Sequence, residues 1–140
     1  MTAYEPLRLL AEDAQDLEVL SAALRDAVAR VGDIEFDPRR RRLTIAVNRY
    51  RWEVGGERVR SALQLGSVLS VQTRRVRRHA KGAVVELLAL AFAPEEPPGG
   101  VVTLSFAGGG DLWARVECVD AVLADVSPPW PARRTPAHEA

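Results

Sequence analysis

The chain has 140 residues, 47% of them hydrophobic, and a formal net charge of zero. This length fits one domain, and folding at this size buries roughly two-thirds of the extended chain's surface, so the core needs no disulfide or metal. A single cysteine excludes an internal disulfide. The N-terminal residues lack the pattern of a signal peptide, and no apolar run approaches the roughly 20 residues that cross a bilayer. We therefore expect a cytoplasmic protein with no membrane partner.

The charge is concentrated in the middle third of the chain. Residues 36–82 carry 12 Arg, one Lys and 3 acidic residues, a net charge of +10, whereas residues 1–35 and 83–140 each carry −5. A basic segment of this kind is a candidate surface for anionic partners, nucleic acid included. The alternative is a solvated face that the 16 acidic residues of the flanking segments neutralise.

The first elements in chain order are a strand and a helix. Residues 7–10 form a short apolar run that predicts an edge strand. Asp13 can accept a hydrogen bond from an amide of the first helical turn, as N-cap residues do. Leu17, Leu20 and Leu24 follow at helical spacing and give one apolar stripe. The pattern predicts an amphipathic helix over residues 13–25.

The rest of the chain is typical of short strands. Ile34 and Phe36 alternate before the turn dipeptide Asp37-Pro38, and a second alternating run starts at Leu43. Period-two or apolar runs bounded by glycine or proline predict further strands at residues 43–52, 59–65, 68–73, 83–93, 102–106 and 112–118. Residues 119–126 fit a strand or a short helix.

These elements predict an α+β fold. One N-terminal helix would pack on a curled, meandering antiparallel sheet of six to eight strands. Such a sheet would be a half-barrel, and a pleckstrin-homology-like barrel is one specific form of it, although there the helix is C-terminal. Residues 1–126 would form the single domain. Residues 127–140 would form a proline-rich tail, extended or disordered, with Trp130 docking back on the domain or on a second copy.

The candidate binding residues lie in two arginine-rich loops and at the end of one strand. Arginine suits phosphate because its planar fork donates two parallel hydrogen bonds, and aromatic rings can stack on bases. The loops would form one surface if they lie at the same end of the sheet. The candidates are Arg39, Arg40, Arg41, Arg42, Arg49, Tyr50, Arg51, Trp52, Arg74, Arg75, Arg77 and Arg78.

The second group has a structural alternative. Trp52 would pack on the helix, and Arg49 or Arg51 would pair with helix acids such as Asp16 or Glu18. This alternative is the favoured interpretation of these residues.

The sequence predicts no catalytic, metal or cofactor site. Cys118, His79 and His138 are dispersed and do not have the spacing of zinc ligands. Residues 108–110 lack the Lys-Ser/Thr that follows a phosphate-binding loop, and no serine or cysteine sits in a nucleophile elbow.

Three separated segments resemble one family. They are residues 13–53 (DAQDLEVLSAALRDAVARVGDIEFDPRRRRLTIAVNRYRWE), residues 103–126 (TLSFAGGGDLWARVECVDAVLADV) and the Trp-Pro tail. The chain resembles, over nearly its whole length, an alphaproteobacterial family catalogued as domain of unknown function 2948. The resemblance implies no activity and no ligand residues.

The expected function is therefore a non-catalytic binding or assembly module. A protein partner or self-association is the first expectation, and a nucleic acid or phosphate ligand on the central arginines is the second. A small enzyme of unknown reaction is the third. High salt would weaken anion binding but not an apolar interface.

Overall fold

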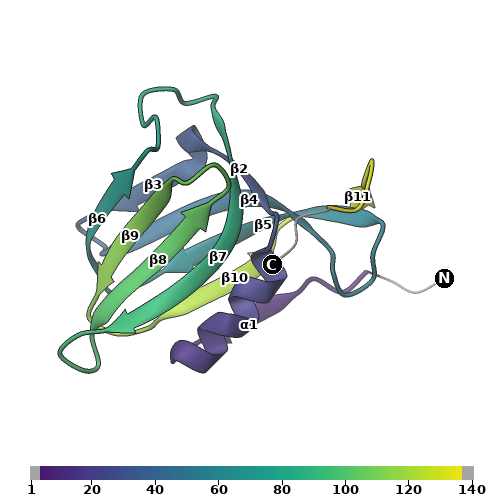
Figure 1. Ribbon diagram of the computed structural model, residues 1–140. Helices are drawn as coiled ribbons and strands as arrows, with labels where there is room; N and C mark the ends of the chain where they lie inside the picture. The colour runs from purple at the N-terminus through teal and green to yellow at the C-terminus, as the bar shows by residue number, and fades with distance from the viewer. Residues whose placement is uncertain (1–3, 137–140) are drawn as a thin grey trace.

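The computed structural model describes residues 4–136 and is built on one antiparallel sheet with one α-helix (Figure 1). Among these residues, no helix is long and apolar enough to cross a membrane. The elements in chain order are β1 (Arg8–Ala11), α1 (Ala14–Leu24), β2 (Val28–Arg30), the 3-10 turn η1 (Val31–Asp33), β3 (Ile34–Asp37), β4 (Arg42–Tyr50), β5 (Glu57–Leu65), β6 (Val68–Arg74), β7 (Val84–Pro94), β8 (Gly100–Phe106), β9 (Asp111–Val116), β10 (Ala121–Asp125) and β11 (Trp130–Pro131).

The predicted helix is confirmed, with its start and its buried face. The Asp13 carboxylate accepts a hydrogen bond from the Asp16 amide at 2.8 Å, which satisfies one of the unpaired amides of the first turn. The three leucines of the apolar stripe are all at most 1% exposed. They hold α1 against β7 and β1.

The strands confirm the α+β class but not the meander. Their order is β1-β10-β5-β4-β2-β7-β8-β9-β6, with β3 on β4 and β11 on β5. The pairs β5–β10, β6–β9 and β2–β7 join strands that are distant in sequence. The sheet has eleven strands and not six to eight, because β2 and β11 are too short to show alternation. It is open and not strongly curled, so the half-barrel and its pleckstrin-homology-like form are not observed.

The ambiguous stretch at residues 119–126 contains a strand, and the tail docks on the sheet. Trp130 pairs with Arg58 of β5, and the Ala132 amide donates to the Gly56 carbonyl at 2.9 Å. The Trp130 side chain is still 37% exposed. The tail thus docks back on the domain through the backbone of residues 130–132, and residues 137–140 lie outside the described part.

The core is one hydrophobic cluster to which α1 and most strands contribute. In Figure 1, β7, β8, β9 and β6 lie in front of β4, β5 and β10. Inward positions alternate along each strand, as at Leu43, Ile45 and Val47 of β4 and at Val102 and Leu104 of β8. Polar groups that fall on these inward positions must find partners inside the protein.

Replacement of the helix N-cap is expected to destabilise the fold. Asp13→Ala should lower the free energy of unfolding by about 1 kcal/mol, because the Asp16 amide loses its acceptor. Urea denaturation measures this change. Gln15→Ala, an exposed change in the same turn, is the control and should differ from wild type by less than about 0.5 kcal/mol. Equal stability of both variants would contradict the assigned cap.

Candidate anion-binding site

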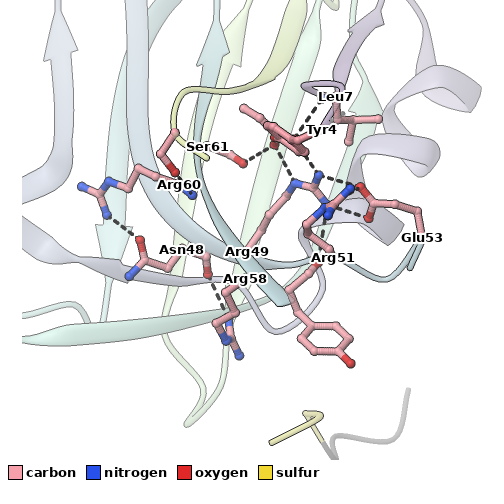
Figure 2. Close-up of polar contacts among 12 residues, drawn as sticks. Tyr4, Leu7, Asn48, Arg49, Arg51, Glu53, Arg58, Arg60 and Ser61 are labelled. Carbon is pink, nitrogen blue, oxygen red and sulfur yellow. Dashed lines mark hydrogen bonds and ion pairs between the residues drawn. The ribbon is translucent and has the colours of Figure 1, made fainter. Parts of the chain in front are cut away.

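Arg49, one of the candidate binding residues, is buried and has a structural role. Alternation along β4 places it on the inward face with Val47, and its side chain is 0% exposed. Its Nε and Nη2 atoms donate to the two carboxylate oxygens of Asp125 at 2.9 and 3.0 Å. Its Nη1 and Nη2 atoms donate to Glu53 at 3.0 and 2.8 Å (Figure 2). A buried guanidinium needs this degree of pairing, because an isolated buried charge is very costly.

Asp125 collects three further donors at the same place. Its carboxylate accepts hydrogen bonds from the Ser61 hydroxyl at 2.7 Å, the Tyr4 hydroxyl at 2.6 Å and the Leu7 amide at 2.9 Å. Burial alone would raise the pKa of Asp125, but the donors, Arg49 first, hold it at about 2. We call Arg49, Asp125, Glu53, Ser61 and Tyr4 the buried polar network.

The other members of the network keep their ordinary charge states as well. Burial and the bond to Asp125 raise the pKa of Tyr4 to about 12. Burial works against the charged form of Arg49, but the bonds to Glu53 and Asp125 outweigh it and raise its pKa. None of these groups is poised to exchange a proton near neutral pH, so the network has the character of a structural element and not of an acid–base site.

Tyr50, Arg51 and Trp52 also serve the fold. The Tyr50 hydroxyl accepts from the Gly56 amide at 2.7 Å and lies 3.1 Å from the Thr135 hydroxyl. The Trp52 ring nitrogen donates to the Arg25 carbonyl at 2.9 Å, beside the C-terminal end of α1. Trp52 thus meets the end of α1, as the structural alternative expected.

The expected ion-pair partners were wrong. Arg49 pairs with Asp125 and Glu53, and Arg51 donates to Glu57 at 2.5 Å. Neither pairs with Asp16 or Glu18. The reason is that β4 runs beside β5, and β5 runs beside β10: Glu53 lies in the β4–β5 connection, Glu57 begins β5, and Asp125 ends β10.

The first arginine-rich loop is the tight turn after β3. The Asp37 carboxylate accepts from the amides of Arg39 and Arg40 at 3.1 and 3.3 Å, which stabilises the turn that the Asp37-Pro38 dipeptide predicted. Arg41 forms an ion pair with Glu117. Arg39 and Arg42 are exposed, and within residues 4–136 neither has an ion pair.

The second loop, residues 75–83, is called the β6–β7 connection below. It follows Arg74, which pairs with Asp111 at 2.8 Å. Within the connection Arg75, Arg77, Arg78 and Lys81 are exposed, and none of them forms an ion pair with a described residue. Backbone hydrogen bonds such as Ala80 to the Arg77 carbonyl, at 3.0 Å, fold the connection into successive turns.

The two loops lie at opposite ends of the short strand β3. The Gly32 amide, just before β3, donates to the Lys81 carbonyl at 2.9 Å. A Cβ at Gly32 would lie only 3.0 Å from that oxygen, so glycine permits this close approach. The turn with Arg39 follows β3. In Figure 1 the connection is the teal loop at the top, after β6.

A small cavity of about 50 Å³ lies beside the β6–β7 connection. Side chains from β3 and β6 line it, together with Arg78 and Lys81 of the connection. The predicted arginines without an ion pair in residues 4–136 are thus Arg39 and Arg42 in the first loop and Arg75, Arg77 and Arg78 in the second, and of these Arg78 lines the cavity.

Sequence reasoning missed the cavity and most of the buried polar network. A usable signal existed, because Arg49, Ser61 and Asp125 each continue the inward alternation of an apolar strand. No group of three His, Cys, Asp or Glu in residues 4–136 could hold a metal ion. His79 is exposed in the connection, Cys118 is half-buried, and His138 lies outside the described residues.

Loss of the Asp125 carboxylate is expected to destabilise the protein strongly. Asp125→Ala should lower the free energy of unfolding by about 3–5 kcal/mol, because Arg49 would keep a buried charge without its main partner. Urea denaturation measures the change. Glu117→Ala, which breaks the exposed pair with Arg41, should cost about 1 kcal/mol or less. If the two variants lose similar stability, the assigned importance of the network is wrong.

The network also predicts acid sensitivity. The pKa of Asp125 is about 2 when folded and about 3.9 when unfolded, so the folded state favours the carboxylate. Its contribution is complete above pH 4 and is lost as the pH falls to 2. The loss should be on the order of 2 kcal/mol. Urea midpoints between pH 5 and 2 test this, and Asp125→Asn should show a shallower fall. An unchanged slope in that variant would assign the acid sensitivity to other carboxylates.

Of three comparisons with known proteins, one found a match. No curated protein and no solved structure matches the chain. One family model matches residues 7–138, nearly the whole length. The chain therefore belongs to the family described as protein of unknown function (DUF2948).

Proposed function

We propose that the protein is a non-catalytic binding module that takes up an anionic partner at the β6–β7 connection. The supporting observation is the group of exposed cations Arg75, Arg77, Arg78 and Lys81, none of which has an acidic partner within the described chain. This is the largest group of unpaired cations within one connection of residues 4–136.

The distribution of acids strengthens this proposal. The flanking acidic residues were an alternative source of neutralisation for the basic middle. In the structure several of them do pair with arginines of the basic middle, but with arginines outside the connection: Asp125 with Arg49, Asp33 with Arg60 and Asp111 with Arg74. The positive charge of the connection is therefore left for a partner.

The buried polar network supports a non-catalytic role. Its carboxylate and guanidinium are committed to each other, and their pKa values lie far from neutrality. The ionisable groups of the connection are exposed to water, and they do not form a nucleophile–base pair.

The geometry favours a small anion over nucleic acid. Tyr50 and Trp52 are the side chains expected to stack on the bases of a nucleic acid. Their polar atoms hydrogen-bond to Gly56 and Arg25, and neither residue lies in the connection. Each exposed ion pair contributes about 0.2–1 kcal/mol, so four cations give a binding free energy of at most about 4 kcal/mol. This corresponds to a dissociation constant of about 1 mM or weaker for a bare anion.

A protein partner or a second copy is the other candidate. Trp113 on β9 and Leu69 on the neighbouring strand β6 are 43% and 46% exposed. Both are apolar side chains of the kind that interfaces bury.

Amide NMR with inorganic phosphate tests the proposal. At 50 mM NaCl, phosphate should shift the amides of residues 75–82 with a dissociation constant of about 1–10 mM, and 500 mM NaCl should abolish the shifts. Arg77→Gln/Arg78→Gln should lose most of the response.

The matched control is Arg39→Gln/Arg42→Gln, which removes the same charge at the other end of β3. It should bind phosphate as wild type does. Equal loss in both double variants would show a general charge effect and would overturn the proposed site.

A further inference from the structure

We infer that the cavity beside the β6–β7 connection binds a small amphipathic anion: a carboxylate or phosphate monoester with a short apolar tail. The tail would enter the cavity, and the connection would hold the head group. This inference rests on the proposed function, because the head group uses the same cations.

The cavity has an apolar floor and a polar rim. Ten residues line it. The rim is formed by the side chains of Thr73, Arg78 and Lys81. The other lining residues are all aliphatic or aromatic: Val31, Ile34, Phe36, Leu43, Val71, Val76 and Leu112. A few polar groups at the edge of an apolar pocket are typical of small-molecule sites.

The cavity exists because the sheet is incomplete here. β6 is the last strand of the sheet path, and β3 pairs only with β4. The two strands border the cavity without pairing to each other, so their inward side chains have no complete cover. Phe36 and Val71 are only half-buried, although both contact the core. A bound apolar tail would remove this surface from water, which is favourable.

The rim selects for negative charge. The lining carries two cations and no Asp or Glu. Neither Arg78 nor Lys81 forms an ion pair within residues 4–136, so an anionic head meets no competing carboxylate. The Thr73 hydroxyl can donate one further hydrogen bond. A cationic ligand with the same tail meets repulsion.

The volume limits the length of the tail. The cavity of about 50 Å³ is one-third of the roughly 150 Å³ that accommodates benzene in an engineered protein. It therefore fits about two or three carbons. Each buried methylene contributes about 0.8 kcal/mol, which is about a fourfold gain in affinity. Three carbons would give a gain of roughly fiftyfold over the bare head group, and further carbons would stay in solvent.

Two homologous series test the inference on the full chain by calorimetry and amide NMR. The first is inorganic, methyl, ethyl, propyl and hexyl phosphate. The second is acetate, propionate, butyrate and hexanoate. Affinity should rise about fourfold per carbon and level off near three carbons of tail. The stronger series identifies the head group. Propylamine, protonated at neutral pH, should not bind.

A response that is independent of chain length would overturn the inference. If phosphate still shifts the connection amides in that case, the proposed function stands without the cavity. If no anion shifts those amides, the proposed function fails too.

A variant that fills the cavity, compared with a control variant on the same strand, gives a second test of the inference. Val71→Phe should remove the gain with chain length and leave the response to inorganic phosphate. Leu69→Phe adds a ring to an exposed position of the same strand and should keep the gain. If Val71→Phe does not fold, Ile34→Phe fills the cavity from β3 and should have the same effect. Retention of the chain-length gain in the filled variant would overturn the inference.

Discussion

The burial of one guanidinium constrains this fold more than any other single interaction. Arg49 lies inside the protein, and its charge is tolerated only because Asp125 and Glu53 surround it with carboxylate oxygens. Asp125 in turn is opposite Ser61 in the β5–β10 register and also binds Tyr4. The hydrogen bonds around one buried charge therefore fix the positions of β4, β5, β10 and the segment before β1 relative to each other. Because hydrogen bonds are directional, they set these positions more precisely than apolar contacts do.

This constraint also explains how the basic middle of the chain is divided. Ion pairs with acids make several of its arginines part of the architecture: Arg41, Arg49, Arg51, Arg60 and Arg74. Arg75, Arg77, Arg78 and Lys81 sit in the β6–β7 connection, where no described acid forms an ion pair with them. A net charge of zero for the whole chain thus hides a local excess at one loop. Local pairing, and not composition, decides where an anion can bind.

The sequence predicted what local patterns determine. Asp13 and the leucine stripe determine the helix, Asp37-Pro38 determines the turn, and alternation determines most strands. The pairing of β5 with β10, of β6 with β9 and of β2 with β7 could not be predicted. For example, nothing in the sequence around Leu63 indicates that Leu123 of β10 is its neighbour. The site is a similar case: Arg78 and Lys81 were visible as a basic run, but the cavity beside them depends on two strands failing to pair. Arg49 was assigned to the wrong acids because its inward register was not weighed against the position of Asp125.

The position of Asp125 has a consequence for the protein as it is synthesised. Ribosomes release the chain from its N-terminus, so Arg49 emerges long before the carboxylate that neutralises it. The hairpin of β4 and β5 can form early, but β10 must arrive before its inward face is complete. Until residue 125 has emerged, Arg49 must remain hydrated, and the β4–β5 surface around it cannot become dry. Completion of the fold is therefore a late event in translation, dominated by contacts between distant segments, which fold slowly.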